Sequence, residues 1–256
     1  MHQMMPVLFV GHGSPMNAVG ENHITQGWRS MVVSCDTPTA ILCISAHWYT
    51  KGTRVLSSEL PRTIHDFYGF PRELYALSYP APGDVGLARR IGKLLGKSVT
   101  ADDSWGLDHG TWSVLRHLYP EADIPVVQLS IDAHASAQAL YDQGMKLGAL
   151  RDEGVLVVGS GNIVHNLALV DMDMAGGFPW AIEFDAYIRD NIVGHRHEGV
   201  VDYRQAGACA EDAFWTREHF DPLLVALGAA GCDGAVAIYN EVFFAGSVSM
   251  TSYRFG

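Results

Sequence analysis

The sequence is poor in basic residues and contains no long apolar run. Its 17 lysines and arginines are outnumbered by 28 aspartates and glutamates, which gives a formal net charge of −11. This charge would repel the phosphates of a nucleic acid and the anionic lipids of a membrane. No stretch reaches the roughly 18 apolar residues that a membrane-spanning helix needs. We therefore expect neither a nucleic acid nor a membrane as a partner.

Cysteine is also scarce, with four residues at positions Cys35, Cys43, Cys209 and Cys232. None of them form a C-x-x-C pair, which excludes a zinc ribbon and a thioredoxin-like motif. The chain as given shows no secretory leader, so a reducing cytoplasm is the expected location. We expect the protein to act there as a monomer or a small homo-oligomer.

Several common catalytic motifs are incomplete or missing. Residues 11–16 begin like a dinucleotide fingerprint, but Met16 occupies the third glycine position and Pro15 disturbs the helix start. Ser14 and Ser160 lack the glycines that flank a nucleophile elbow, and no H-E-x-x-H sequence occurs. The sequence therefore offers little support for a nucleotide cofactor or for a serine hydrolase.

Short apolar runs alternate with amphipathic stretches along the whole chain. The predicted strands are residues 7–10, 40–45, 126–131, 155–158, 235–239 and 248–253. The predicted helices are residues 24–33, 85–95, 112–118, 135–151, 180–193 and 217–229, with Asp84 and Thr216 as N-caps. This alternation predicts an α/β fold with a central, mostly parallel or mixed sheet, flanked by helices on both faces. We expect residues 1–256 to form a single catalytic domain.

One segment, residues 58–83, is rich in proline, glycine and aromatic residues and has no periodicity. A loop of this length in a compact domain is more often functional than idle. We therefore expect this segment to contribute to the functional site.

Twelve histidines are present, and three of them follow predicted strands. His12 comes after strand 7–10, His47 after strand 40–45, and His165 shortly after strand 155–158. Ligands of α/β sheets bind beyond the carboxyl ends of the strands, so these side chains are expected to meet. Neutral imidazoles bind Zn(II), Fe(II) and similar ions without cancelling their charge. Such a site suits an anionic substrate with oxygen donors, for example a catecholate.

The segments around these histidines resemble those of a known protein family. In chain order they are GHGSPMN (11–17), SAHW (45–48), TIHDFYGFP (63–71), YPAPG (79–83), WGLDHG (105–110), PVVQLSID (125–132), SGNIVHNL (160–167), EHFDPLL (218–224) and GSVSM (246–250). Together they resemble the class III extradiol ring-cleavage dioxygenases, in the branch of the 4,5-DOPA extradiol dioxygenases. The matching segments extend over almost the whole chain in the order expected for that family.

The resemblance implies a role for each candidate residue. His12, His47 and His219 would hold the metal. His165 would lie at the same site, as a further ligand or as the acid/base, and His109 would lie close to the substrate oxygens as the second group that moves protons. His65, in the long loop, either touches the substrate or packs within the loop. The implied reaction is the opening of a catechol ring by O₂, with Fe(II) as the active metal.

The third metal-binding position and the metal itself stay open. Class III enzymes as a whole use two histidines and a carboxylate, and here Glu218 and Glu241 are the carboxylates available beside His219. An all-histidine site would fit Zn(II) as well as Fe(II). Two other functions remain: a zinc hydrolase with Asp66, Asp108 or Glu241 as general base, and a non-enzymatic metal-binding protein.

Overall fold

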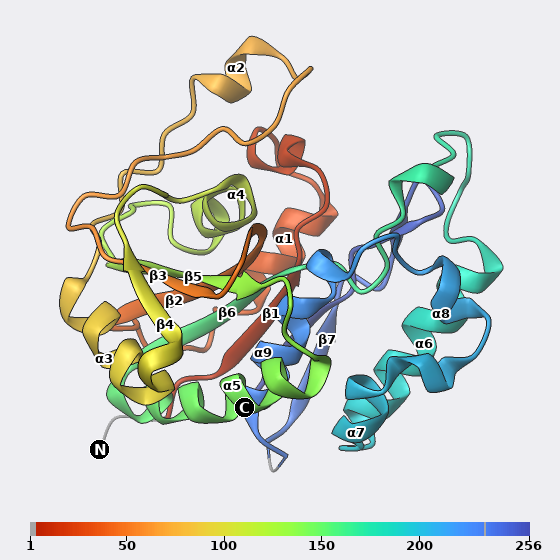
Figure 1. Cartoon of the computed structure of the whole chain (residues 1–256). Helices are drawn as coiled ribbons and strands as arrows, with labels where there is room; N and C mark the ends of the chain where they lie inside the picture. The colour runs from red at the N-terminus through yellow and green to blue at the C-terminus, as the bar shows by residue number, and fades with distance from the viewer. Residues whose placement is uncertain (1–3, 233) are drawn as a thin grey trace.

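The molecule is organised around one central sheet (Figure 1), and the computed structural model describes residues 4–232 and 234–256. The strands of this sheet are β1 Val7–Gly11, β2 Ala40–Thr50, β3 Thr53–Leu56, β4 Val99–Asp102, β5 Val126–Asp132, β6 Val155–Gly161, β7 Val236–Tyr239 and β10 Ser252–Phe255. Within the described residues these eight strands run in the order β4-β3-β5-β2-β6-β1-β10-β7.

The middle of the sheet is parallel. Strands β5, β2, β6 and β1 all run in one direction. At one edge β10 is antiparallel to β1, and β7 is antiparallel to β10. At the other edge β3 pairs antiparallel with β5 and parallel with β4. β1 and β6 are buried along their full length, as expected for parallel strands covered on both faces. The prediction of a mixed α/β sheet is confirmed.

Helices cover both faces of the sheet (Figure 1). The helices are α1 His23–Ser30, α2 Arg72–Tyr75, α3 Val85–Leu95, α4 His109–Leu118, α5 Ala137–Leu147, α6 Pro179–Val193, α7 His197–Val201, α8 Cys209–Asp212 and α9 Asp221–Ala230. One apolar core contains side chains of α1 and α4, and the other contains side chains of α3, α5, α6 and α9. None of the helices in residues 4–232 and 234–256 is long and apolar enough to cross a bilayer.

The strand predicted for residues 248–253 is wrong as one element. Its first part is β9, Val248–Ser249, which pairs with β8, Phe243–Phe244, in a separate two-stranded sheet. Its second part is β10, which begins at Ser252 and joins the central sheet. A continuous apolar pattern does not show that the two halves pair with different partners.

The helix predicted for residues 217–229 is also divided. A 3-10 turn spans Arg217–His219, and α9 begins at Asp221 with a proline in its first turn. Thr216 precedes the 3-10 turn but makes no side-chain cap, whereas Asp84 accepts a hydrogen bond from the Leu87 N–H of α3 as predicted. Proline favours the first turn of a helix, which explains why a new helix starts here.

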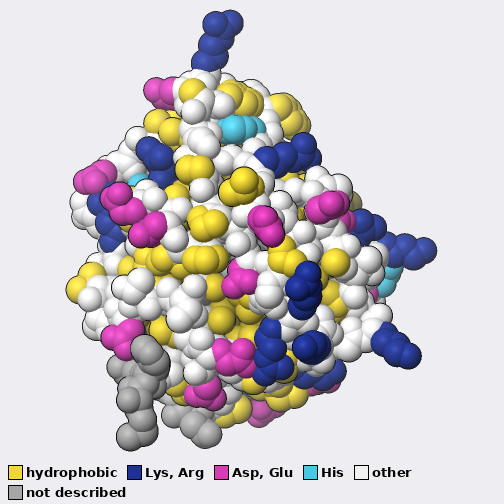
Figure 2. All heavy atoms as spheres, turned by 90° about the vertical axis from the view of Figure 1, so that its left-hand side faces the viewer, with side chains coloured by type: hydrophobic (Ala, Val, Ile, Leu, Met, Phe, Trp, Pro, Cys, Tyr) yellow, Lys and Arg dark blue, Asp and Glu magenta, His cyan; other side chains and the backbone are white. Residues whose placement is uncertain are grey.

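Charged side chains are mixed rather than segregated on the face shown in Figure 2, where acidic, basic and apolar groups alternate. Arg90 of α3 lies 2.6 Å from Glu153, and Arg54 of β3 lies 2.7 Å from Asp102. These basic side chains are therefore neutralised by neighbouring carboxylates.

Candidate metal centre

The ends of neighbouring strands bring histidines to one place. β1 and β6 are in register up to Gly11 and Gly161, and β2 pairs with β6 over the same stretch. His12 follows β1 directly, and His47 lies near the end of β2, where the pairing with β5 shifts register. His165 follows β6. The three histidines therefore lie on the same side of the sheet, at the carboxyl ends of its parallel strands.

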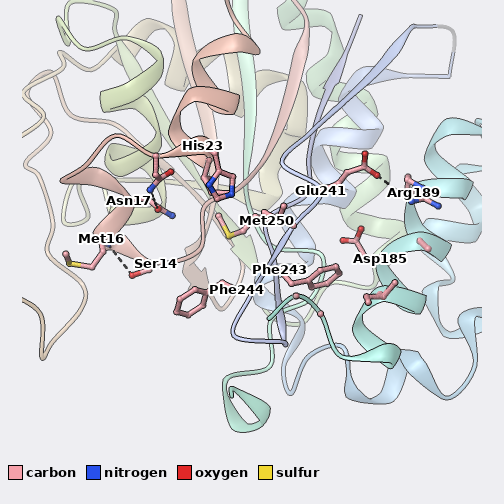
Figure 3. A pocket seen from close by; sticks show the side chains of 17 residues that line it. Ser14, Met16, Asn17, His23, Asp185, Arg189, Glu241, Phe243, Phe244 and Met250 are labelled. Atoms are coloured by element: carbon pink, nitrogen blue, oxygen red, sulfur yellow. Dashed lines mark hydrogen bonds and ion pairs between the residues drawn. The ribbon is translucent and has the colours of Figure 1, made fainter. Parts of the chain in front are cut away.

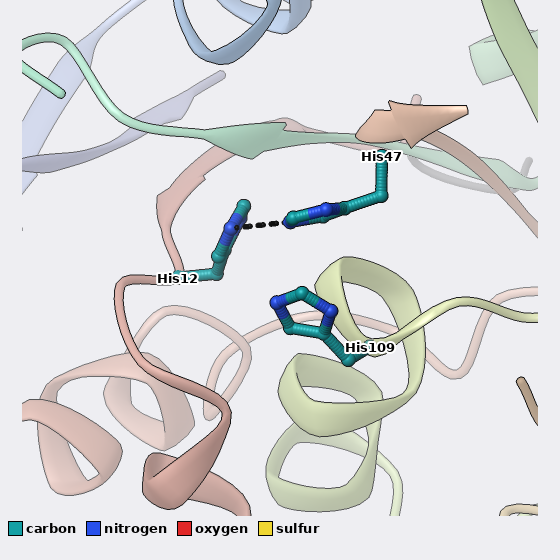
Figure 4. Close-up of side chains that lie close together, drawn as sticks. All are labelled: His12, His47 and His109. Carbon is teal, nitrogen blue, oxygen red and sulfur yellow. Dashed lines mark hydrogen bonds between the residues drawn. The ribbon is translucent and has the colours of Figure 1, made fainter. Parts of the chain in front are cut away.

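His12, His47 and His109 form a first group (Figure 4). The Nε2 atoms of His12 and His47 are 3.1 Å apart, and the rings of His47 and His109 have centroids 3.9 Å apart. One nitrogen from each of the three rings lies within 4.8 Å of the others. His109, expected near the substrate oxygens, is therefore as close to the other two imidazoles as a ligand would be.

His165, Glu218 and His219 form a second group with donor atoms within the same limit of 4.8 Å. The rings of His165 and His219 are stacked, with centroids 3.5 Å apart. The His219 ring also lies 5.4 Å from that of His12 and 5.1 Å from that of His47. The two groups adjoin, and we refer to the five histidines as the histidine cluster.

Glycine at the end of β6 allows the backbone of His219 to approach the sheet. A Cβ atom on Gly161 would overlap the carbonyl oxygen of His219. The same oxygen accepts a hydrogen bond of 2.8 Å from the Asn162 N–H. A strand that ends in Gly-Ser-Gly-Asn thus allows the close contact that brings His219 to His12 and His47.

The outward-facing ring nitrogens have oxygen partners. The Ser160 hydroxyl donates its proton to the Gly110 carbonyl at 2.5 Å, so its oxygen accepts from His12 Nδ1–H at 3.0 Å. His219 Nδ1 lies 3.3 Å from a Glu218 carboxylate oxygen. Both contacts favour a proton on Nδ1 and leave Nε2 as a free lone pair. This is the usual arrangement of a metal-binding histidine. No sequence pattern indicates that Ser160 is the partner of His12, because the two residues are 148 positions apart.

Asp66 reaches the cluster from the long loop. Its Oδ1 accepts a 2.9 Å hydrogen bond from the His109 backbone N–H, and its Oδ2 lies 3.3 Å from His47 Nδ1. Oδ1 is also 3.0 Å from His109 Nδ1, although the direction of this contact is not that of a hydrogen bond. Burial acts to raise the pKa of Asp66, but the contacts with His109 and His47 outweigh it and leave the pKa lowered.

Burial keeps four imidazoles of the cluster neutral: those of His12, His47, His165 and His219. It lowers the pKa of His47 to about 3 and that of His165 to about 4, although Asp66 and Glu218 oppose the shift. The pKa values of His12 and His219 lie well below the usual range because of burial and, next, repulsion from the neighbouring imidazoles. Neutral imidazole is the form that binds a metal, so the cluster is ready for a cation at neutral pH.

These contacts fit a divalent metal ion. If His12 and His47 both carry their proton on Nδ1, two lone pairs face each other at 3.1 Å in a buried site. A cation between or beside them would satisfy both, which a neutral hydrogen bond cannot do. The donor set is mostly imidazole, which suits Fe(II) and Zn(II) alike.

The remaining candidate residues lie outside the histidine cluster. His65 Nε2 is 3.0 Å from the Leu77 carbonyl oxygen, and its ring packs against Phe67, whose ring in turn contacts His109. Asp108 is buried at the start of α4, where its carboxylate accepts hydrogen bonds from Ser45 and Gln128.

Glu241 belongs to a different cleft, shown in Figure 3, where it lies 3.5 Å from Arg189. The cleft has a volume of about 1050 Å³ and lies between the residues after His12, α6 and the β8–β9 hairpin. Its lining includes Met16, Phe244 and Met250 but none of the clustered histidines. Glu241 is therefore not placed as a metal ligand.

Comparison with known proteins shows the family of this chain. The model of the family described as "Catalytic LigB subunit of aromatic ring-opening dioxygenase" matches residues 5–256. The chain belongs to this family. The LigB-family protein is thus an enzyme of the ring-opening dioxygenases, and the resemblance seen in the sequence motifs is confirmed.

Individual relatives match this chain over nearly its full length. It is 44% identical to the 4,5-DOPA dioxygenase extradiol of Escherichia coli (strain K12), over 98% of this chain and 95% of the relative. It is 40% identical to the protein of the same name from Beta vulgaris, over 96% of this chain and 95% of the relative. The crystal structure of an uncharacterized protein from Escherichia coli K12 superimposes with a TM-score of 0.85 and 40% identity, covering 98% of this chain and all (100%) of that chain.

Proposed function

We propose that this protein is an extradiol dioxygenase that opens the ring of a catechol, such as DOPA, with O₂ and Fe(II). The observation that carries the proposal is the pair of Nε2 atoms of His12 and His47, 3.1 Å apart and surrounded by further imidazoles. The two named relatives, both 4,5-DOPA dioxygenases, support DOPA or a similar catechol as the substrate.

His12, His47 and His219 would hold the metal through Nε2, because their Nδ1 atoms face Ser160, Asp66 and Glu218 respectively. A bound Fe(II) ion supplies the redox chemistry that joins O₂ to the catechol, which Zn(II) cannot supply. Because the imidazoles are neutral, the site keeps a positive charge that favours a catechol in its anionic form.

His165 and His109 would move the protons. Burial lowers the pKa of His165 to about 4, so at neutral pH its unprotonated ring nitrogen can accept the proton of a catechol hydroxyl. The Asp66 carboxylate lies 3.0 Å from His109 Nδ1, on the side of the ring that faces the long loop. His109 can then return a proton from Nε2 to a substrate oxygen.

We give His65 a role at the edge of the substrate site. Its Nε2–H is directed to the Leu77 carbonyl at 3.0 Å, which leaves Nδ1 as an acceptor for a polar group on the substrate. Residues 1–256 would act as one catalytic domain. The cysteines Cys35, Cys43, Cys209 and Cys232 are all free, which is consistent with our proposal of a reducing cytoplasm.

A zinc hydrolase is less well supported because each of its candidate bases is engaged elsewhere. Asp66 contacts His47 and His109, and Asp108 accepts hydrogen bonds from Ser45 and Gln128. Glu241 lies in the separate cleft beside Arg189. A hydrolytic water at the cluster would therefore lack these three carboxylates as a base.

The test is anaerobic loading of the metal-free protein with Fe(II), followed by O₂ and a small panel of catechols that includes DOPA. We expect a yellow ring-opened product that requires both Fe(II) and O₂. The Zn(II)-loaded protein, prepared in parallel, should give none. Ring opening or ester hydrolysis by the zinc form without O₂ would contradict the proposal.

A further inference from the structure

The long segment 58–83, which connects β3 to α3, reaches the histidine cluster through Asp66. This carboxylate is in contact with two members of the cluster at once. Oδ2 lies 3.3 Å from His47 Nδ1, and Oδ1 accepts the His109 backbone N–H at 2.9 Å. The Asp66 side chain is only 14% exposed, so water competes weakly for these contacts.

The position of Asp66 is well defined by its own segment. The Ile64 N–H donates to the Leu107 carbonyl at 2.7 Å, and the Leu107 N–H donates to the Arg62 carbonyl at 2.9 Å. The Trp112 indole N–H of α4 then donates to the Ile64 carbonyl at 2.8 Å. The residues before Asp66 are thus tied to the residues that lead into α4, which carries His109. A carboxylate held in this way can orient its partners rather than follow them.

The chemistry of a carboxylate determines which nitrogen of His47 carries the proton. An ionised carboxylate carries negative charge and no hydrogen to donate, so it favours the histidine tautomer that has its proton on the nearer nitrogen. Asp66 has two oxygens to offer, one of which accepts the His109 backbone N–H at 2.9 Å while the other lies 3.3 Å from His47 Nδ1. The charge of Asp66, 3.3 Å from His47 Nδ1, therefore favours a proton on Nδ1 and an unprotonated Nε2 toward His12, 3.1 Å away.

We propose that Asp66 is a positioning residue that fixes the tautomer of His47 and the orientation of His109, and so prepares the cluster to bind its metal. This rests on the proposed function only in taking the histidine cluster as a metal site. The long loop thereby acquires a specific role, because its carboxylate contacts two histidines that belong to different elements, β2 and α4.

Asp66→Asn separates this role from packing because asparagine has nearly the same shape. Its amide oxygen can still accept the His109 N–H, which leaves the NH₂ group facing His47 Nδ1. That donor requires Nδ1 to be an acceptor, so the proton moves to Nε2, the atom needed for the metal. Asp103→Asn, at an exposed position, is the matched control for the loss of one negative charge.

Two measurements on the metal-free proteins test the proposal. Nitrogen-15 NMR of labelled histidine should show His47 with its proton on Nδ1 in the wild type and on Nε2 in Asp66→Asn. Titration with Zn(II) should show binding about 10- to 100-fold weaker in Asp66→Asn, the usual cost of losing such a partner, and unchanged in Asp103→Asn. The unfolding midpoint of metal-free Asp66→Asn should remain close to that of the wild type.

The outcomes separate this inference from the proposed function. If the wild type binds no metal, the metal site itself fails. If the wild type binds Zn(II) and Asp66→Asn binds it equally well, the site stands and the role of Asp66 is refuted. Should Asp66→Asn fail to fold, the wild-type spectrum alone decides, because a proton on Nε2 of His47 in the metal-free protein contradicts the proposal.

Discussion

Gly11, the last residue of β1, allows His12 to reach the cluster, and replacing it by alanine tests this directly. A Cβ atom on Gly11 would lie 2.6 Å from the Met250 carbonyl oxygen, 2.7 Å from its carbonyl carbon and 2.9 Å from its Cα. Real Cβ contacts essentially never fall under 3.0 Å, so either β1 or the Met250 backbone must move by about 0.4 Å. Both are backbone in a buried region, so neither can rotate away.

This shift determines the expected size of the effect. Overpacking a buried site costs typically ~1–3 kcal/mol of stability. The side chains of a functional site must be held within about 0.5 Å of their productive positions. Because His12 directly follows Gly11, a backbone shift of this size would move its imidazole by most of that distance. We expect Gly11→Ala to bind Zn(II) about tenfold more weakly than the wild type and to unfold at a lower urea concentration.

Gly92→Ala is the control, because Gly92 lies in the interior of α3 and an added Cβ meets nothing within 4 Å. Alanine is the better helix former, so this variant should be more stable by up to about 1 kcal/mol and should bind Zn(II) normally. Metal affinities are measured by calorimetric titration of the metal-free proteins. Wild-type affinity in Gly11→Ala would refute the argument that this close contact positions His12.

Three further outcomes follow from buried or partly buried polar groups. Burial raises the pKa of Asp185 to about 6, above its usual 3.8, although the Ser249 and Thr251 hydroxyls oppose the shift. The folded form therefore holds its proton longer than the unfolded form, so this group's contribution to stability falls between about pH 4 and 6 by roughly 3 kcal/mol and is constant above. In urea unfolding, Asp185→Asn should lose this part of the decrease in the free energy of unfolding with pH. A pH profile equal to that of the wild type would contradict the prediction. Arg151 is buried and donates to the Met5 and Ala230 carbonyls at 2.7 Å each, so Arg151→Met should lose about 2–4 kcal/mol in the same assay. His65→Ala should raise the KM for the catechol several-fold while Zn(II) affinity stays at the wild-type value. A weaker Zn(II) affinity in this variant would mean that His65 belongs to the metal site and not to the substrate site.

The convergence of the histidines could be predicted because it follows from sheet topology alone. The carboxyl ends of parallel strands lie on the same side of the sheet, so residues at or just beyond the ends of β1, β2 and β6 must meet there. The same rule does not extend to His219, which reaches the cluster from a 3-10 turn before α9. Its participation was implied by the resemblance to a family, and its position depends on Gly161 at the end of β6.

The side chains that contact the ring nitrogens and backbone of the histidines could not be predicted from the sequence. Ser160 lies 148 positions from His12, and Asp66 lies 43 positions from His109. No local pattern connects residues so far apart, and serine or aspartate beside a histidine motif has many structural uses. The short strands β3 and β4 were missed for another reason, since their four-residue segments have too few apolar positions to show a period.

The most direct test of the metal centre is a titration of the metal-free protein with Fe(II) under argon, repeated for single alanine variants of His12, His47 and His219. We expect one ion per chain in the wild type, and in each variant a loss greater than the ~10- to 100-fold typical of an outer partner. His134→Ala, an exposed histidine, should bind like the wild type. If any of the three variants keeps wild-type affinity, that histidine is not a ligand and the proposed metal centre is wrong.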